Sequence, residues 1–395
     1  MGESMSQTAF ADLQVIDADT HFTEPHDLWT SRAPEGLAER LPRVVDLDGH
    51  PTWAVGATTL GRAMASSVID RDGNRCRGSS FLGWGFDDTP PGAYDVPTRL
   101  AVMDELGIHA QIVYPNVAGF GGQKFAEVGD PESRRLCVEI YNDAMAEIQE
   151  ASRGRLYPMA LLPWWDVAAT VAEAERIAAA GLRGVNLTSD PQVQSALPDL
   201  GDRAWDPLWE TCADLALPVH FHIGASQTTL AWYGSSPWPS HGDDQKLAIG
   251  SAMMYITNAR VLANVIYSGM LERHPRLKVV SVESGIGWIP FVLEALDHQA
   301  NETAAGTMDY LSMPPSAYFR RQIYACYWFE RQDVAHTFEV LGTDNILFET
   351  DFPHPPCLYP DSLAYAAEGL AGVSPEVQRK VLQDNAAALY RIPVG

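Results

Sequence analysis

Eight short apolar runs, separated by longer stretches with helical spacing, constrain the fold of this chain more than any other feature. The runs lie at 15–19, 109–114, 156–162, 184–188, 218–223, 278–283, 322–328 and 346–350. Apolar residues recur at helical spacing in the segments 131–151, 167–180, 204–215, 252–273, 287–297, 333–341 and 375–390. A strand followed by a helix, repeated eight times, predicts a (β/α)8 TIM-like barrel. An open doubly wound sheet is the alternative, but no GxGxxG motif follows the first run, which weakens its dinucleotide-binding form.

Two long segments interrupt this repeat. Residues 24–97 follow the first predicted strand, are rich in glycine and proline, and contain a predicted hairpin turn at 46–49. Residues 225–250 follow the fifth strand and carry Trp232, Tyr233 and Trp238. Loops of this length are usually functional lids or disordered segments, and the aromatic residues favour ordered lids on the catalytic face. With no linker or internal repeat, residues 1–395 are predicted to form one domain with two insertions.

Residue types that bind metal ions stand at the ends of four predicted strands: Asp19 and His21, His220 and His222, Glu283, and Asp351 with His354. Residues two apart in a strand point to the same side, and the strand ends of a barrel converge on its catalytic face. Histidine and carboxylate together suit zinc, iron or manganese. Carboxylates gathered there without a cation would repel one another. We therefore predict a metal site at the barrel mouth.

Each of these residues also has a structural explanation. A single histidine on a strand, such as His220, is more often a hydrogen-bonded core residue, and an aspartate at a strand end is often a helix N-cap. The convergence of four strand ends favours the metal site. Trp164, Trp288 and Trp328, at or after strand ends, are predicted to line an apolar substrate pocket, with core packing as the alternative.

Charge and cysteine content exclude several classes of protein. The chain has 27 Lys and Arg against 51 Asp and Glu, a net charge of −24, which argues against a nucleic-acid or anionic-membrane partner. No segment reads as a transmembrane helix or a signal peptide. The five cysteines are scattered without a CxxC pair, so neither a disulfide framework nor a thiolate zinc site is indicated. We expect a reduced, cytoplasmic protein.

Four stretches carry a resemblance to a known family: VIDADTHFTEPHDLW at 15–29, LPVHFHIG at 217–224, HPRLKVVSVESGIGWIPFVLEALD at 274–297 and NILFETDFPHP at 345–355. In this order they resemble the amidohydrolase-related family, in the branch of the aminocarboxymuconate-semialdehyde decarboxylase-like enzymes. The resemblance implies a TIM-like barrel with a mononuclear or dinuclear metal centre. It also implies that Asp19 and His21 are the first-strand ligands, His222 the fifth-strand ligand and Asp351 the eighth-strand aspartate.

The sixth strand departs from the family pattern. The decarboxylases and hydrolases of this family usually have a histidine followed by glycines there, whereas this chain has Glu283. With Glu283 and His354 added, there are enough ligands for two metals, and a bridging carboxylate can span such a pair. Glu24 and His220 are further candidate ligands. This pattern resembles a subgroup with a dinuclear iron or manganese–iron centre that activates oxygen.

Three functions compete on this basis. We favour a dinuclear monooxygenase that uses O2 to hydroxylate an organic acid or acyl compound, with Glu283, Asp351 and His354 as catalytic residues. The alternative is a metal-dependent hydrolase or non-oxidative decarboxylase, with zinc in the hydrolase case. The third is an inactive barrel serving as a partner subunit. The expected partner is a small-molecule substrate, with a homodimer through the helix at 252–273 as a further hypothesis. Arg320 and Arg321 are the candidates for a carboxylate clamp.

Overall fold

Parallel strands close into a barrel in the computed structural model, which describes residues 10–355 and 357–395. The order in the nine-stranded sheet is β6-β5-β1-β12-β11-β10-β9-β8-β7. The bounds are β1 Val15–His21, β5 Ile108–Tyr114, β6 Leu156–Pro158, β7 Ala160–Leu161, β8 Val185–Asn186, β9 Val219–His222, β10 Val279–Val282, β11 Ile323–Tyr327 and β12 Ile346–Phe348. Strands β6 and β7 are two halves of one predicted strand, separated only by Met159, so the sheet closes on itself. The predicted (β/α)8 barrel is confirmed.

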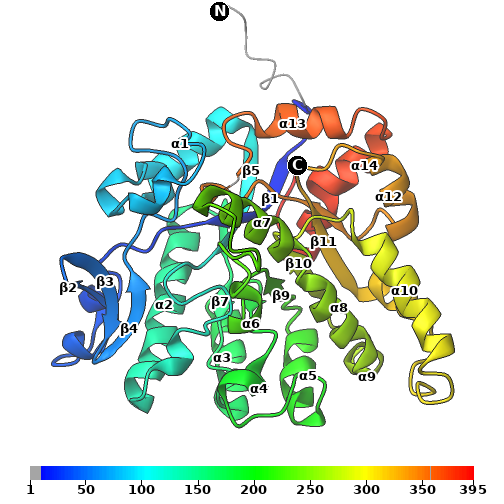
Figure 1. Ribbon diagram of the computed structural model, residues 1–395, viewed down its shortest axis with the longest axis horizontal. Coiled ribbons are helices and arrows are strands. Elements are labelled where there is room, and N and C mark those ends of the chain that lie inside the picture. The colour runs from blue at the N-terminus through cyan, green and yellow to red at the C-terminus, as the bar shows by residue number, and fades with distance from the viewer. Residues whose placement is uncertain (1–9, 356) are drawn as a thin grey trace, which may run out of the picture.

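Helices surround this barrel (Figure 1). They are α1 Val96–Leu106, α2 Pro131–Ala151, α3 Val167–Ala179, α4 Pro191–Gln194, α5 Asp206–Asp214, α6 Gln227–Leu230, α7 Asp243–Tyr255, α8 Asn258–Tyr267, α9 Met270–Arg273, α10 Ile289–Glu302, α11 Pro315–Gln322, α12 Val334–Leu341, α13 Ser362–Gly369, α14 Pro375–Arg379 and α15 Asn385–Tyr390. The helix predicted at 252–273 is broken into three, and its last break falls at Gly269, whose φ of 72° no right-handed helix contains. Helices α1, α11 and α13 were not predicted. Helix α1 buries only Arg99 and Met103, so it has no apolar stripe to reveal it.

Strand residues alternate between two apolar layers, as the period of two requires. Val15 packs in the layer between the barrel and its helices, whereas Ile16 packs in the interior of the barrel. The interior layer also contains Leu389 and Tyr390 of α15, so this last helix contributes to filling the barrel. Tyr390 is fully buried there.

The first insertion has two parts with different positions. Strands β2 Arg43–Leu47, β3 His50–Val55 and β4 Thr58–Arg62 form an antiparallel sheet at the left of Figure 1, beside α2. The predicted turn is confirmed, because Leu47 pairs with His50. Trp53 of β3 packs on Trp29, which packs in turn on Tyr141 of α2. This sheet therefore lies on the flank of the barrel, which corrects the expectation that the whole insertion covers the mouth.

The second part of the first insertion does reach the mouth. Val68 N donates to Pro353 O (3.0 Å), in the loop after β12. Val68 and Phe81 pack against Phe352 and Cys357 of the same loop. The other insertion contributes α6 and the start of α7.

The assignment of residues 1–395 to a single domain stays a prediction. Within the described residues, no helix combines the length and apolarity that crossing a bilayer requires.

Candidate metal centre

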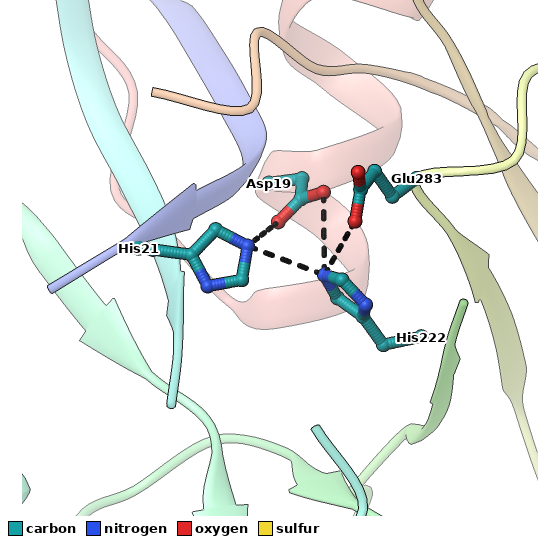
Figure 2. Close-up of side chains that lie close together, drawn as sticks. All are labelled: Asp19, His21, His222 and Glu283. Carbon is teal, nitrogen blue, oxygen red and sulfur yellow. Dashed lines mark hydrogen bonds and ion pairs between the residues drawn. The ribbon is translucent and has the colours of Figure 1, made fainter. Parts of the chain in front are cut away.

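Side chains from three strand ends point toward one another at the mouth of the barrel. Figure 2 shows Asp19 and His21 from β1, His222 from β9 and Glu283 after β10. His222 Nε2 lies 3.3 Å from Glu283 Oε2 and 3.7 Å from Asp19 Oδ2. His21 Nε2 lies 3.6 Å from Asp19 Oδ1 and 3.3 Å from His222 Nε2. Two imidazole nitrogens and two carboxylates thus surround one point, which is the donor set of a divalent metal ion.

A second group shares His21 with the first. His21 Nε2 lies 3.5 Å from Asp351 Oδ1, and His354 Nδ1 lies 3.7 Å from the same oxygen. The rings of His21 and His354 are stacked with centroids 3.5 Å apart. The other ring nitrogen of His354 lies 2.6 Å from Asn116 Oδ1, which orients the ring. All six predicted metal and catalytic residues are therefore adjacent, while their roles stay a prediction.

The unpaired carboxylate oxygens of Asp19 and Asp351 fit a cation. Both side chains are fully buried, and none of their four oxygens has a hydrogen-bond partner in the described chain. Burial raises the pKa of both carboxyl groups, and the charges of Glu283 and Asp19 raise that of Asp351 further. Burial likewise raises the pKa of Glu283 to about 8. Charged carboxylates without partners are costly in the interior, and a bound metal ion removes that cost.

Local backbone geometry aims three of these side chains. His222 Nδ1 lies 2.8 Å from Ile223 O, so it carries the proton and leaves the lone pair on Nε2. Glu283 and Asp351 both have left-handed backbones, with φ of 55° and 59°. This conformation is strained for residues with a Cβ, and at Asp351 it is held by the backbone bond from Asp351 N to Asp19 O (2.9 Å). Strain of this kind clusters at functional sites.

The structure does not place Glu24 or His220 in the cluster. His220 lies one layer deeper than His222, with Nδ1 2.9 Å from Val185 O and Nε2 2.9 Å from Tyr390 Oη. Both ring nitrogens are therefore engaged, which corrects the suggestion of a ligand. Glu24 Oε1 accepts from Asn116 N (2.8 Å), so it holds the loop that carries Asn116.

The three predicted pocket tryptophans do not line the cavity at the mouth. Trp164 donates to Gly121 O in the core, and Trp288 donates to Ser284 O of its own loop. Trp328 is fully buried behind Tyr255. The cavity is lined instead by other aromatic residues: Phe81, Tyr233, Tyr255, Phe329, Tyr359 and Tyr365. The contacts of a tryptophan depend on segments distant in the chain, such as α7 over Trp328, and strand position alone does not reveal them.

Two of those tyrosines are Tyr233 of the second insertion and Tyr255 at the C-terminal end of α7. Burial, together with the negative charges of Glu283 and Asp351, raises the pKa of Tyr233 to about 12. The same causes raise the pKa of Tyr255. The cavity wall also includes Pro355, which directly follows His354 in the chain, so the cavity lies next to the loop that carries Asp351 and His354.

A buried network beneath the cluster was missed by sequence reasoning. Asp17 accepts hydrogen bonds from Thr350 N (2.9 Å), Thr350 Oγ1 (2.6 Å) and Gln111 Nε2 (3.2 Å). Arg99 donates to Gln111 Oε1 and to His21 O, both at 2.8 Å. The network joins β1, β5 and β12 immediately beside candidate ligands. One signal was available, because Asp17 is a second carboxylate in the first apolar run, two residues before Asp19.

Glu349 is a second buried carboxylate that sequence reasoning missed. It lies two residues before Asp351, as Asp17 lies two residues before Asp19. Its Oε2 accepts from Glu283 N (3.0 Å), which holds the left-handed turn at Glu283. Arg320 and Arg321 are the candidates for a carboxylate clamp. They donate to Val340 O of α12 and to Leu271 O of α9, and they do not approach the mouth.

Fold and cluster together define the class of protein: a (β/α)8 barrel with a divalent-metal donor set at its mouth. The sequence model of the family described as amidohydrolase matches residues 16–392. The chain therefore belongs to the amidohydrolase family.

Several proteins resemble the chain over most of its length. It is 25% identical over 307 residues to a gamma-resorcylate decarboxylase of Polaromonas sp., covering 74% of this chain and 86% of the relative. An amidohydrolase structure from Mycobacterium avium subsp. paratuberculosis has 22% identity and a TM-score of 0.73, covering 96% and 99% of the two chains. A dihydroxybenzoic acid decarboxylase from Polaromonas sp., with bound manganese and an inhibitor, has 20% identity and a TM-score of 0.60, covering 97% and 98%.

These relatives correct the functional prediction. The monooxygenase interpretation is wrong, because the named relatives are decarboxylases. That interpretation rested on Glu283 in place of a histidine. In the structure Glu283 is one more oxygen donor beside His222, an arrangement that suits divalent metals in general and is not specific to oxygen chemistry.

Proposed function

We propose that this protein is a metal-dependent, non-oxidative decarboxylase of an aromatic carboxylic acid. The observation that carries the proposal is the buried cluster of histidines and carboxylates that adjoins an aromatic-lined cavity. The decarboxylase relatives support it, since their names specify aromatic acids. The reaction consumes no oxygen, so O2 has no place among the partners.

Within this proposal, Asp19, His21, His222 and Asp351 hold the metal. A bound divalent ion would supply a Lewis acid that polarises an oxygen of the substrate. Glu283 and His354 are 5% and 7% exposed, against 0–1% for the other members of the cluster, so they are placed to exchange protons with a substrate. The ring carbon accepts a proton, the bond to the carboxylate then breaks, its electron pair restores the aromatic ring, and CO2 leaves.

The identity and number of the metal ions are part of the proposal. We propose manganese, which the Polaromonas decarboxylase structure contains. The prediction of two ions, iron or manganese with iron, stays a prediction, since the two groups of donors share His21. Elemental analysis of protein purified under nitrogen measures both quantities.

The test is CO2 release under nitrogen from a panel of hydroxybenzoates, by protein loaded with manganese. We expect turnover in the intact protein and none in Asp351→Asn. Turnover that requires O2, or hydrolysis of esters or amides without CO2 release, would contradict the proposal, and the second result would favour the hydrolase alternative.

A further inference from the structure

A large cavity separates the two insertions at the barrel mouth. Its volume is about 960 Å³, at the upper end of the range of about 300–1,000 Å³ for sites that bind drug-sized ligands. Its wall includes Tyr233 and Tyr255, Pro355 next to the candidate ligand His354, and two arginines of the first insertion, Arg75 and Arg77. The cavity therefore has room for a substrate larger than a single ring.

The arginines are held by a short hairpin that is anchored on the barrel. Ile69 pairs with Arg75 in an antiparallel bridge, and Cys76 N donates to Val68 O (2.6 Å). Val68 N in turn donates to Pro353 O, one residue before His354. Residues two apart in an extended segment share a side, and both arginines line the same cavity.

Neither arginine has an acidic partner among the described residues. Arg75 Nε is buried and has no hydrogen-bond partner there. The Cys357 thiol lies within hydrogen-bonding reach of the Arg75 side chain, but a thiol is only a weak acceptor. Asp244 and Asp361 also line the cavity, but both are exposed and neither forms an ion pair with an arginine of the hairpin. A guanidinium donor that is buried without a partner indicates a ligand that supplies the acceptor.

We propose that Arg75 and Arg77 bind a second anionic group of the substrate, across the cavity from the carboxylate that is lost. This inference rests on the proposed function for the position of the first carboxylate. The substrate class is then an aromatic acid with two anionic groups. A planar guanidinium binds a carboxylate through two parallel hydrogen bonds, so the arginines determine specificity.

The experiment measures binding by calorimetry with manganese-loaded protein and matched pairs of ligands. The pairs are benzoate with isophthalate, and 2-naphthoate with 2,6-naphthalenedicarboxylate. We expect the intact protein to bind at least one diacid about tenfold or more tightly than its monoacid. We expect Arg75→Gln and Arg77→Gln to remove this preference while monoacid binding is unchanged. The matched control is Arg71→Gln, which lies at the turn of the same hairpin but outside the cavity wall, and should keep the preference.

The outcomes separate this inference from the proposed function. If no diacid is preferred, or if the preference survives in both arginine variants, the inference is overturned even where CO2 release is observed. If the preference exists and depends on the arginines while no CO2 is released, the inference stands and the proposed function fails. Should Arg75→Gln not fold, Arg77→Gln carries the same test, because its exposed side chain supports no core packing.

Discussion

At the scale of single residues, two histidines on β9 have opposite environments. His222 Nε2 faces the cluster, whereas both nitrogens of His220 are engaged by Val185 O and Tyr390 Oη. We expect His222→Gln to lose the metal. His220→Gln should keep it but lower the free energy of unfolding by about 1–3 kcal/mol, because a buried partner is left unpaired. Elemental analysis and urea unfolding measure the two effects. Metal loss in the His220 variant alone would refute the assignment.

Asp17 is expected to position the metal ligands without touching the metal. It bonds Thr350, next to Asp351, and is two residues from Asp19. We expect Asp17→Asn to weaken manganese binding by about 10–100-fold, as outer partners of metal ligands do. Competition with a chelator measures this affinity.

The control for Asp17 is a buried carboxylate far from the mouth. Glu173 of α3 pairs with Arg176 and accepts from Asn142. Glu173→Gln should lower the free energy of unfolding while manganese affinity stays unchanged. An equal loss of affinity in both variants would mean that Asp17 acts only through general stability.

At the scale of elements, the last helix, α15, fills part of the barrel interior, which the sequence did not predict. Tyr390 is fully buried in the inner layer, and its hydroxyl lies 2.9 Å from His220 Nε2. We expect Tyr390→Ala to lower the free energy of unfolding by about 3–5 kcal/mol through the void it leaves. Tyr390→Phe should cost about 0.5–1.5 kcal/mol through the lost hydrogen bond. Denaturant midpoints measure both values, and equal costs for the two variants would contradict this role.

At the scale of the whole molecule, the metal is expected to stabilise the fold. The donors come from strands far apart in the chain, so the unfolded chain does not gather them. A ligand that binds only the folded state at 100 times its Kd adds about 2.7 kcal/mol. We expect a chelator to lower Tm and added manganese to restore it. Asp351→Asn should show no such shift, and a similar shift in that variant would place the metal elsewhere.

Association of the whole molecule stays a prediction. Helix α7 exposes Ile249 and Met253, and Ile256 follows it, with exposed fractions of 37%, 37% and 42%. An apolar patch of this kind is compatible with a homodimer. Sedimentation of the purified protein measures the oligomeric state.

Much of this protein was determined by local sequence. The period of two in each apolar run and the period of 3.6 between runs predict the order of strands and helices, because both periods depend only on neighbours in the chain. Asp19, His21, His222, Glu283 and Asp351 could be selected because they end strands, and strand ends in a barrel meet on one face. The hairpin turn at 46–49 follows from its own residues.

Only the tertiary structure determines how deep a residue lies, which groups it contacts and whether it reaches the cavity. His220 and His222 share a side of β9, and only closure of the barrel sets which layer each occupies. Segments distant in the chain decide whether an aromatic residue lines the cavity or the core, so Trp328 is buried behind Tyr255 while Tyr255 lines the cavity. Arg75 became a candidate for substrate binding only when its hairpin was seen to pack on the loop after β12. Such contacts join residues hundreds of positions apart, and no local period records them.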